Sequence, residues 1–175
     1  MLTVCTSTDP QPVLEGADSA LRTVLLGEAD RDRLRTHLLR LDPDDRRMRF
    51  MRARSDVDSA TFATDADFGT ATRLGFVDLD GHLVALAEGF SYAVGSQARM
   101  EVAFSTDAGW RRRGLATRLF HAMGRIAQER GIERLVLQCD RRNTGMRRLL
   151  RNVGAQTCDE SSEIEAVWNC TGPHR

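Results

Sequence analysis

One stretch, residues 104–120, constrains the fold more than any other part of the chain. It reads as the end of a strand, a turn rich in glycine and arginine, and the start of an amphipathic helix. Backbone N–H groups in the first turn of a helix lack intrahelical partners and, together with the helix dipole, favour phosphate. Gly114 lets a ligand approach the backbone closely, and Arg111, Arg112 and Arg113 add forked cationic donors. The stretch therefore predicts a site for a pyrophosphate group.

This turn is not one of the common phosphate loops, because the chain has neither Gly-x-Gly-x-x-Gly after the strand nor Gly-Lys-Ser/Thr. The order Arg-x-x-Gly-x-Ala, formed by Arg111, Gly114 and Ala116, resembles the acetyl-CoA pyrophosphate loop of the GNAT N-acetyltransferase superfamily. The alternative is an ordinary β–α turn with solvated arginines. The resemblance is favoured because the motif lies between a strand and an amphipathic helix.

The order of predicted elements agrees with this resemblance over about residues 20–170. Strands are expected at 20–27, 72–79, 83–92, 99–106, 134–139, 155–158 and 164–170, and helices at 28–41, 42–52, 56–63, 114–130 and 143–153. Asp80-Gly81 predicts a hairpin, and strands joined through the helix at Gly114 must be parallel. The resemblance implies an α/β (α+β) GNAT fold. Its central mixed, mostly antiparallel sheet has about seven strands, one parallel β-α-β crossover and flanking helices.

Length and composition predict one domain, residues 20–172, after a flexible leader at residues 1–19. The leader holds three acidic residues and no basic one, so it is not a signal peptide. No apolar run approaches the ~18 residues of a membrane span. The four cysteines are far apart and match no metal-ligand spacing. We therefore expect a cytoplasmic protein with free thiols, no metal and no membrane contact.

A net charge of zero hides an uneven distribution. Residues 111–151 carry twelve arginines and three acidic residues, so the rest of the chain is acidic. A basic part suits a polyphosphate cofactor, and an acidic part suits a cationic acceptor such as an amine, although many arginines must form solvated helix faces. No nucleic-acid partner is expected, because no recognised binding motif accompanies the arginines.

The resemblance implies acetyl-CoA as the cofactor and assigns residues to it by position. In the family, the strand before the turn pairs through its backbone with the pantetheine arm, and here that position falls to Phe104, Ser105 and Thr106. An asparagine early in the later helix commonly contacts the cofactor, and Asn143 matches it. The N–H groups of the turn and of the first helical residues bind the pyrophosphate; these residues are Arg111, Arg112, Arg113, Gly114, Leu115, Ala116 and Thr117.

Amide formation from a thioester requires a general base, because an amine with a pKa near ~10 is protonated at neutral pH. Glu101 is the candidate base, since it lies on the strand that leads into the cofactor turn. Residues 41–50 and 100–104 resemble bacterial GNAT protein-lysine acetyltransferases, in which a glutamate on this strand is the base. Glu88 is the second candidate.

The expected environment of Glu101 is apolar. Burial among Met100, Val102 and Phe104 would raise its pKa. The alternative is a strand glutamate that faces water or pairs with an arginine.

The usual general acid is missing. Many family members carry a tyrosine seven residues after the helix asparagine, and that position is Leu150 here. We expect the CoA thiolate to leave without a side-chain acid, with Cys139 and Ser105 as weaker candidate donors.

These features predict an acetyl-CoA-dependent N-acetyltransferase that acts on a primary amine, either a protein lysine or a small molecule. The missing tyrosine leaves open a non-catalytic acyl-CoA-binding sensor with the same fold, although Glu101 on the cofactor strand argues against it. The sequence also leaves open the acceptor, the length of the acyl chain and a homodimer.

Overall fold

The computed structural model describes residues 20–160 and 162–170. The leader expected at residues 1–19 and the domain end expected at residue 172 lie outside the described residues. The strands are β1 (Arg22–Leu25), β2 (Ala71–Val77), β3 (Leu83–Val94), β4 (Gln97–Thr106), β5 (Arg134–Asp140), β6 (Gln156–Glu160) and β7 (Glu163–Asn169). The helices are α1 (Arg31–Arg40), α2 (Pro43–Phe50), α3 (Asp56–Thr64), α4 (Leu115–Glu129) and α5 (Thr144–Asn152), with short 3-10 turns at Glu28–Asp30 and Ala108–Trp110.

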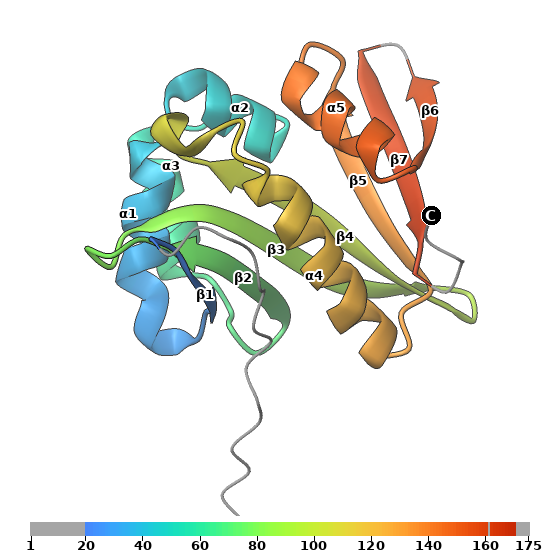
Figure 1. Cartoon of the computed structure of the whole chain (residues 1–175), viewed down its shortest axis with the longest axis horizontal. Coiled ribbons are helices and arrows are strands. Elements are labelled where there is room, and N and C mark those ends of the chain that lie inside the picture. Colours follow the sequence, from blue (N-terminus) through green and yellow to red (C-terminus); the bar gives the residue numbers. More distant parts are fainter. Residues whose placement is uncertain (1–19, 161, 171–175) are drawn as a thin grey trace, which may run out of the picture.

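The strands form one mixed sheet with the order β1-β2-β3-β4-β5-β7-β6 (Figure 1). Neighbouring strands are antiparallel except β4 and β5, which are parallel and are connected through α4. The predicted seven-stranded mixed sheet with one parallel crossover is therefore confirmed.

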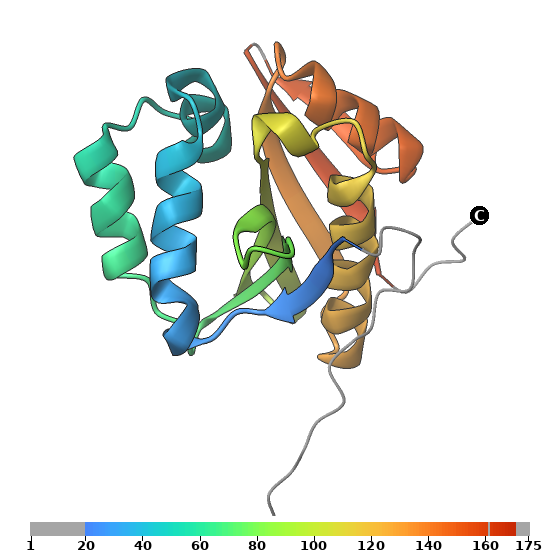
Figure 2. The ribbon, with the colours of Figure 1, turned by 60° about the vertical axis from the view of Figure 1, so that its left-hand side comes forward.

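Helices cover both faces of the sheet, and each face has its own apolar core. Figure 2 shows α1 and α3 on one side of the sheet and α4 on the other. The α1 side buries a cluster that includes Leu34, Leu38 and Leu86. The larger core, beneath α4 and α5, includes Phe120 and Trp168, whose rings meet edge to face at 5.2 Å. No helix in the described part of the chain is long and apolar enough to cross a bilayer.

The start of α4 is fixed by Gly114. This residue precedes the helix with a φ of 76°, a left-handed conformation that glycine adopts without a steric penalty. The helix then buries one face, on which Leu115, Leu119 and Met123 are almost fully enclosed. The buried face fixes the direction of the helix, so its N-terminus is held above the end of β4.

The parallel pair β4–β5 is short, and this shapes the site. The two strands pair at Arg99–Arg134, Met100–Leu135 and Glu101–Val136, and the pairing stops there. Beyond it, β4 continues to Thr106 and β5 to Asp140. Figure 1 shows the two strands diverging toward α2. Backbone groups on the facing edges of the diverging segments are therefore free to bind an inserted ligand.

The sequence prediction missed the end of one hairpin. Strands β3 and β4 stay paired to Val94 and Gln97, beyond the predicted ends at residues 92 and 99. Gly95 makes the turn with a φ of 61°. This ribbon extends past the helices and is exposed on both faces, so it lacks the apolar alternation from which its length could have been predicted.

Candidate active site

A groove of about 1130 Å³ lies where β4 and β5 diverge. Segments of α2, the end of β4, the turn before α4 and the start of α5 enclose it. Ten of the residues predicted to bind the cofactor line this groove: Phe104, Ser105, Thr106, Arg111, Arg112, Gly114, Leu115, Ala116, Thr117 and Asn143. Arg113 is not among the lining residues. The structure therefore brings almost the whole predicted set together.

The turn at the mouth of the groove presents backbone donors. Arg112 and Gly114 both have left-handed backbones, with φ of 62° and 76°. Helix α4 has no side-chain cap and no acidic residue in its first turn. Its first N–H groups therefore have neither an intrahelical nor a capping acceptor, and they suit an anion.

The three arginines of the turn have separate environments. Arg111 forms an ion pair with Asp45 at the start of α2, and Asp42 is 3.8 Å away. Arg113 lies over the ring of Trp110 at 4.6 Å from its centroid. Among the described residues Arg112 has no ion pair, and its side chain is exposed in the lining of the groove. Of the three, Arg112 is therefore the cation most available to a phosphate.

Asn143 caps helix α5. Its Oδ1 accepts a hydrogen bond of 2.9 Å from the backbone N–H of Met146. The amide nitrogen of Asn143 is left to donate toward the groove that the residue lines.

Asp140, at the end of β5, ties this edge of the groove to α2. Its carboxylate accepts hydrogen bonds from Arg142 at 2.8 Å and from Arg47 at 3.1 Å. These bonds, those of Arg142 above all, hold the pKa of Asp140 well below its usual range. Asp140 is therefore an ionised structural anchor rather than a proton acceptor.

Glu101 is the last paired residue of β4 in the β4–β5 ladder, and it is not among the lining residues of the groove. Its side chain is exposed, and it points to the face opposite Met100, Val102 and Phe104, which are buried. The apolar environment expected from the sequence is therefore wrong, because the three hydrophobic neighbours alternate onto the α4 side. The structure places a solvated carboxylate at the vertex where the two strands separate.

Glu88 is a buried ion-pair partner. It is fully buried, its Oε1 accepts a 2.8 Å hydrogen bond from Nε of Arg73, and its Oε2 pairs with Arg49. Arg73 is itself 2% exposed. Both oxygens of Glu88 are therefore occupied by arginines and enclosed, which argues against Glu88 as a base.

A buried histidine that sequence reasoning set aside contacts the groove. Nε2 of His37 lies 2.8 Å from Oγ of Ser105, and Nδ1 lies 2.9 Å from both the Leu83 carbonyl oxygen and Oδ1 of Asp107. His37 is fully buried, and Ser105 lines the groove. The helical spacing of Leu34, His37 and Leu38 was enough to predict that His37 lies on the buried face of its helix. The contact between His37 and Ser105 could not be predicted, because no local pattern connects the two residues.

The other positions discussed for the general acid belong to the core. Leu150 and Cys139 are each 1% exposed, and both pack beneath α4 and α5. Leu150 therefore has a packing role, and the Cys139 thiol does not line the groove.

One further cluster lies in the β2–β3 turn. Ligand atoms of Asp78, Asp80 and His82 lie within 4.8 Å of one another. Oδ1 of Asp78 already accepts hydrogen bonds from the backbone N–H groups of Asp80 and His82, at 3.1 and 2.8 Å. The turn itself accounts for this cluster, which is separate from the groove.

The fold and groove agree with comparisons to known proteins. The Acetyltransferase (GNAT) family matches residues 35–155, so the chain belongs to this family. No curated protein matches the sequence. The predicted family and its fold are therefore confirmed.

Solved structures with this fold resemble the chain closely in shape and weakly in sequence. The GNAT domain of S. lividans PAT has a TM-score of 0.72 at 21% identity, covering 85% of this chain and 90% of that one. Spermidine N-acetyltransferase from Vibrio cholerae, solved with CoA and spermine, has a TM-score of 0.68 at 12% identity, covering 88% and 98%. Ribosomal-protein-S5-alanine acetyltransferase from Vibrio fischeri has a TM-score of 0.69 at 11% identity, covering 88% and 95%.

The buried charge cluster yields a stability prediction. Glu88→Gln leaves Arg49 and Arg73 without a compensating charge, so it should lower the free energy of unfolding by about 3–5 kcal/mol. The matched change Glu101→Gln, at an exposed strand position, should alter it by less than about 0.5 kcal/mol. Urea denaturation followed by circular dichroism measures both. Equal stability of the two variants would contradict the structural role of Glu88.

Proposed function

We propose that this protein is an acetyl-CoA-dependent N-acetyltransferase that transfers the acetyl group directly to a primary amine. The observation that carries the proposal is the divergence of β4 and β5 after Glu101, with the uncapped N-terminus of α4 at the far end. From Glu101 to Thr106, β4 spans about 17 Å. An extended pantetheine arm would follow this strand, with its thioester toward the vertex.

The phosphate end of the cofactor would lie at the start of α4. The N–H groups from Arg113 to Thr117 would bind the pyrophosphate, supported by the helix dipole. Arg112 would add charge, since it has no ion pair among the described residues. Asn143 would donate from its amide nitrogen while its oxygen caps α5.

Glu101 is the proposed general base. It is the last paired residue of β4, so the amine would meet the thioester beside it. In the free protein its carboxylate is solvated. Cofactor and acceptor would exclude water from the vertex, and this would strengthen its attraction for the proton of the attacking amine.

Ser105 is the proposed donor to the leaving thiolate, a role for which the sequence alone gave little support. Its hydroxyl lies at the groove and is bonded to Nε2 of His37. Asp107, 2.9 Å from Nδ1, would stabilise the charge of a protonated His37, and Arg40 holds that carboxylate. Ser105 would pass its proton to the thiolate and recover one from the imidazolium.

The acceptor class follows from the amine chemistry and from the relatives. A spermidine N-acetyltransferase and an alanine acetyltransferase of a ribosomal protein share the fold. A small-molecule amine and an amine of a protein are therefore both acceptors that this scaffold accommodates, and a protein lysine belongs to the second group.

The phosphate site can be tested by a charge at the third residue of α4. Thr117→Glu places a carboxylate among the proposed phosphate donors, so it should weaken CoA binding by about a hundred-fold through charge repulsion. An acidic residue in the first helical turn should leave the helix intact or slightly more stable.

Calorimetric titration with CoA measures the effect, and Thr117→Gln is the control of equal size without charge. If both variants bind CoA like the wild type, the phosphate does not lie at this helix.

The base can be tested by Glu101→Gln, which keeps the shape and removes the proton acceptor. Turnover with acetyl-CoA and an amine should fall by ~10²–10⁴, with CoA affinity unchanged. Glu165→Gln, at an exposed position of β7, is the matched control and should retain full turnover. Wild-type turnover in the Glu101 variant would assign the base to another group.

The donor role of Ser105 predicts a loss of turnover when its hydroxyl is removed. At neutral pH Ser105→Ala should lose about ten-fold in kcat, a modest loss because a thiol of pKa ~8.5 leaves readily. Ser105→Thr retains a hydroxyl and should keep most of the wild-type kcat. A kcat in Ser105→Ala equal to that of the wild type would mean that solvent protonates the thiolate.

A further inference from the structure

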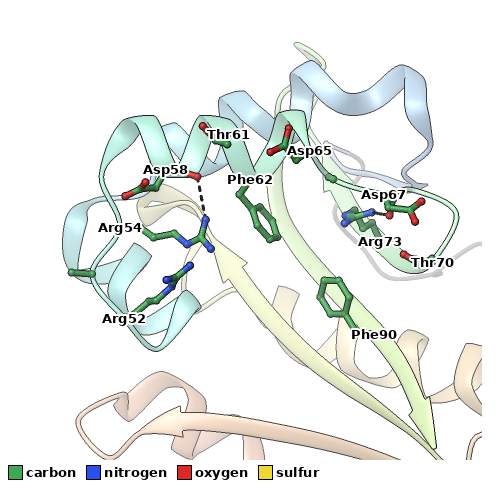
Figure 3. Close-up of a pocket in the computed structure, with 12 residues that line it drawn as sticks. Arg52, Arg54, Asp58, Thr61, Phe62, Asp65, Asp67, Thr70, Arg73 and Phe90 are labelled. Atoms are coloured by element: carbon green, nitrogen blue, oxygen red, sulfur yellow. Dashed lines mark hydrogen bonds between the residues drawn. The ribbon is translucent and has the colours of Figure 1, made fainter.

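A second pocket, of about 510 Å³, lies on the sheet face opposite α4. It is bounded by α3, the segment between α2 and α3, and strands β2 and β3 (Figure 3). Its volume falls in the range of small-ligand sites. The pocket shares no lining residue with the cofactor groove.

This pocket is connected to the proposed base through the register of the sheet. Phe90 lines the pocket, and it is directly opposite Glu101 in the β3–β4 ladder. Opposed residues of an antiparallel pair project from the same face, so Phe90 and Glu101 are neighbours on it. Both side chains are exposed. A molecule in the pocket would therefore extend over Phe90 toward Glu101.

One end of the pocket holds a cation that forms no ion pair among the described residues. The guanidinium of Arg54 lies over the rings of Phe50 and Phe62, 4.2 and 5.1 Å from their centroids. Its Nε is buried and has no hydrogen-bond partner, and its Nη1 donates only to the backbone carbonyl oxygen of Asp58, at 3.1 Å. Burial above all, with the neighbouring charges of Arg52 and Arg49, lowers the pKa of Arg54, and the charge of Asp58 opposes this in part. This end of the pocket therefore favours an anion.

The carboxylates that line the pocket, those of Asp58, Asp65 and Asp67, form no ion pair with that cation in the described part of the chain, although the charge of Asp58 acts on it. Asp58 accepts hydrogen bonds from the backbone and side chain of Ser55, and these lower its pKa. Asp67 is bonded to the loop at Gly69, which lowers its pKa. In the described part of the chain neither Arg52 nor Arg54 forms an ion pair. Arg73, by contrast, is fully engaged with Glu88 and the Asp67 carbonyl oxygen.

The space between the two ends is apolar. Figure 3 shows the rings of Phe62 and Phe90 between Arg54 at one end and the Arg73–Asp67 pair at the other. Aromatic walls of this kind suit methylene groups. A ligand that fits has an anionic group at Arg54, an aliphatic stretch across the rings and a second polar group beside Glu101.

From this geometry we propose that the pocket binds the acceptor and selects an amine that also carries a carboxylate, separated from it by an aliphatic spacer. The carboxylate pairs with Arg54, the spacer lies on Phe62 and Phe90, and the amine reaches Glu101. A free amino acid with a side-chain amine and a lysine peptide with a nearby acidic residue share this chemistry. The inference rests on the proposed acetyltransferase function.

The experiment compares ε-aminocaproate with n-hexylamine, which has the same spacer but no carboxylate. Wild-type enzyme with acetyl-CoA should favour ε-aminocaproate in kcat/KM by about ten-fold or more, the usual contribution of a charge-assisted hydrogen bond. Arg54→Met keeps the apolar contact with the rings and removes the charge. It should abolish the preference and leave the kcat/KM for n-hexylamine within about two-fold.

Controls separate this inference from the proposed function. Arg125→Ala, at an exposed position of α4, should keep the preference. Unchanged CoA affinity shows that Arg54→Met is folded, and Arg54→Lys should restore part of the preference. Peptides in which the lysine is flanked by glutamate or by alanine distinguish a protein acceptor from a free amino acid. If the acceptor is a protein, kcat/KM should be higher with the glutamate peptide than with ε-aminocaproate.

Two outcomes would overturn the inference. One is equal use of ε-aminocaproate and n-hexylamine by the wild type, and the other is a preference that survives in Arg54→Met. Either result leaves the acetyltransferase proposal standing, whereas failure to bind CoA or to acetylate any amine would remove that proposal itself.

Discussion

The site depends on the short pairing of β4 with β5. Parallel strands normally continue their ladder, but here it ends after Glu101. Backbone groups that a longer ladder would consume become available to a ligand, and the opening widens toward the start of α4. Helix α2 lies across this opening, held by Arg47 to Asp140 and by Asp45 to Arg111. The end of the β4–β5 ladder therefore determines where the groove opens, and α2 and the start of α4 are arranged around that opening.

Buried charge stabilises the opposite face of the sheet. Glu88 joins Arg49, which lines the groove, to Arg73, which lines the second pocket. Because Arg49 and Arg73 share the single carboxylate of Glu88, the cluster between the two cavities carries a net positive charge. Removing one partner of a buried ion cluster is costly, so these three side chains hold the wall between the cavities in one arrangement.

Much of the fold and part of the site could be predicted from local sequence. The turn before α4 requires a residue with a left-handed backbone, and Gly114 supplies it. The apolar face of the helix that follows can be read from the spacing of its hydrophobic residues. The part of the groove lining that β4 and the turn before α4 supply followed from the same stretch, whereas the part that α2 supplies was not predicted. The environment of Glu101 was misjudged because neighbours in sequence alternate between faces, and the apolar residues beside it belong to the other side.

The remaining features depend on contacts between distant segments, and no local pattern encodes them. His37 and Ser105 are 68 residues apart in sequence. The ion pair between Arg111 and Asp45 joins the turn before α4 to the first turn of α2, 66 residues apart in sequence. Single-sequence reasoning gives the residue types at such places but not their partners.

The uncapped start of α4 has a consequence for the heat resistance of the domain. The same helix that presents free donors to the groove also packs Phe120 against Trp168 in the main core. A ligand held by those donors binds only the folded chain, so its free energy of binding adds to the free energy of unfolding of the whole domain. At a hundred times its dissociation constant, such a ligand contributes about 2.7 kcal/mol. The melting temperature of the protein is thereby linked to the concentration of the ligand that occupies the groove.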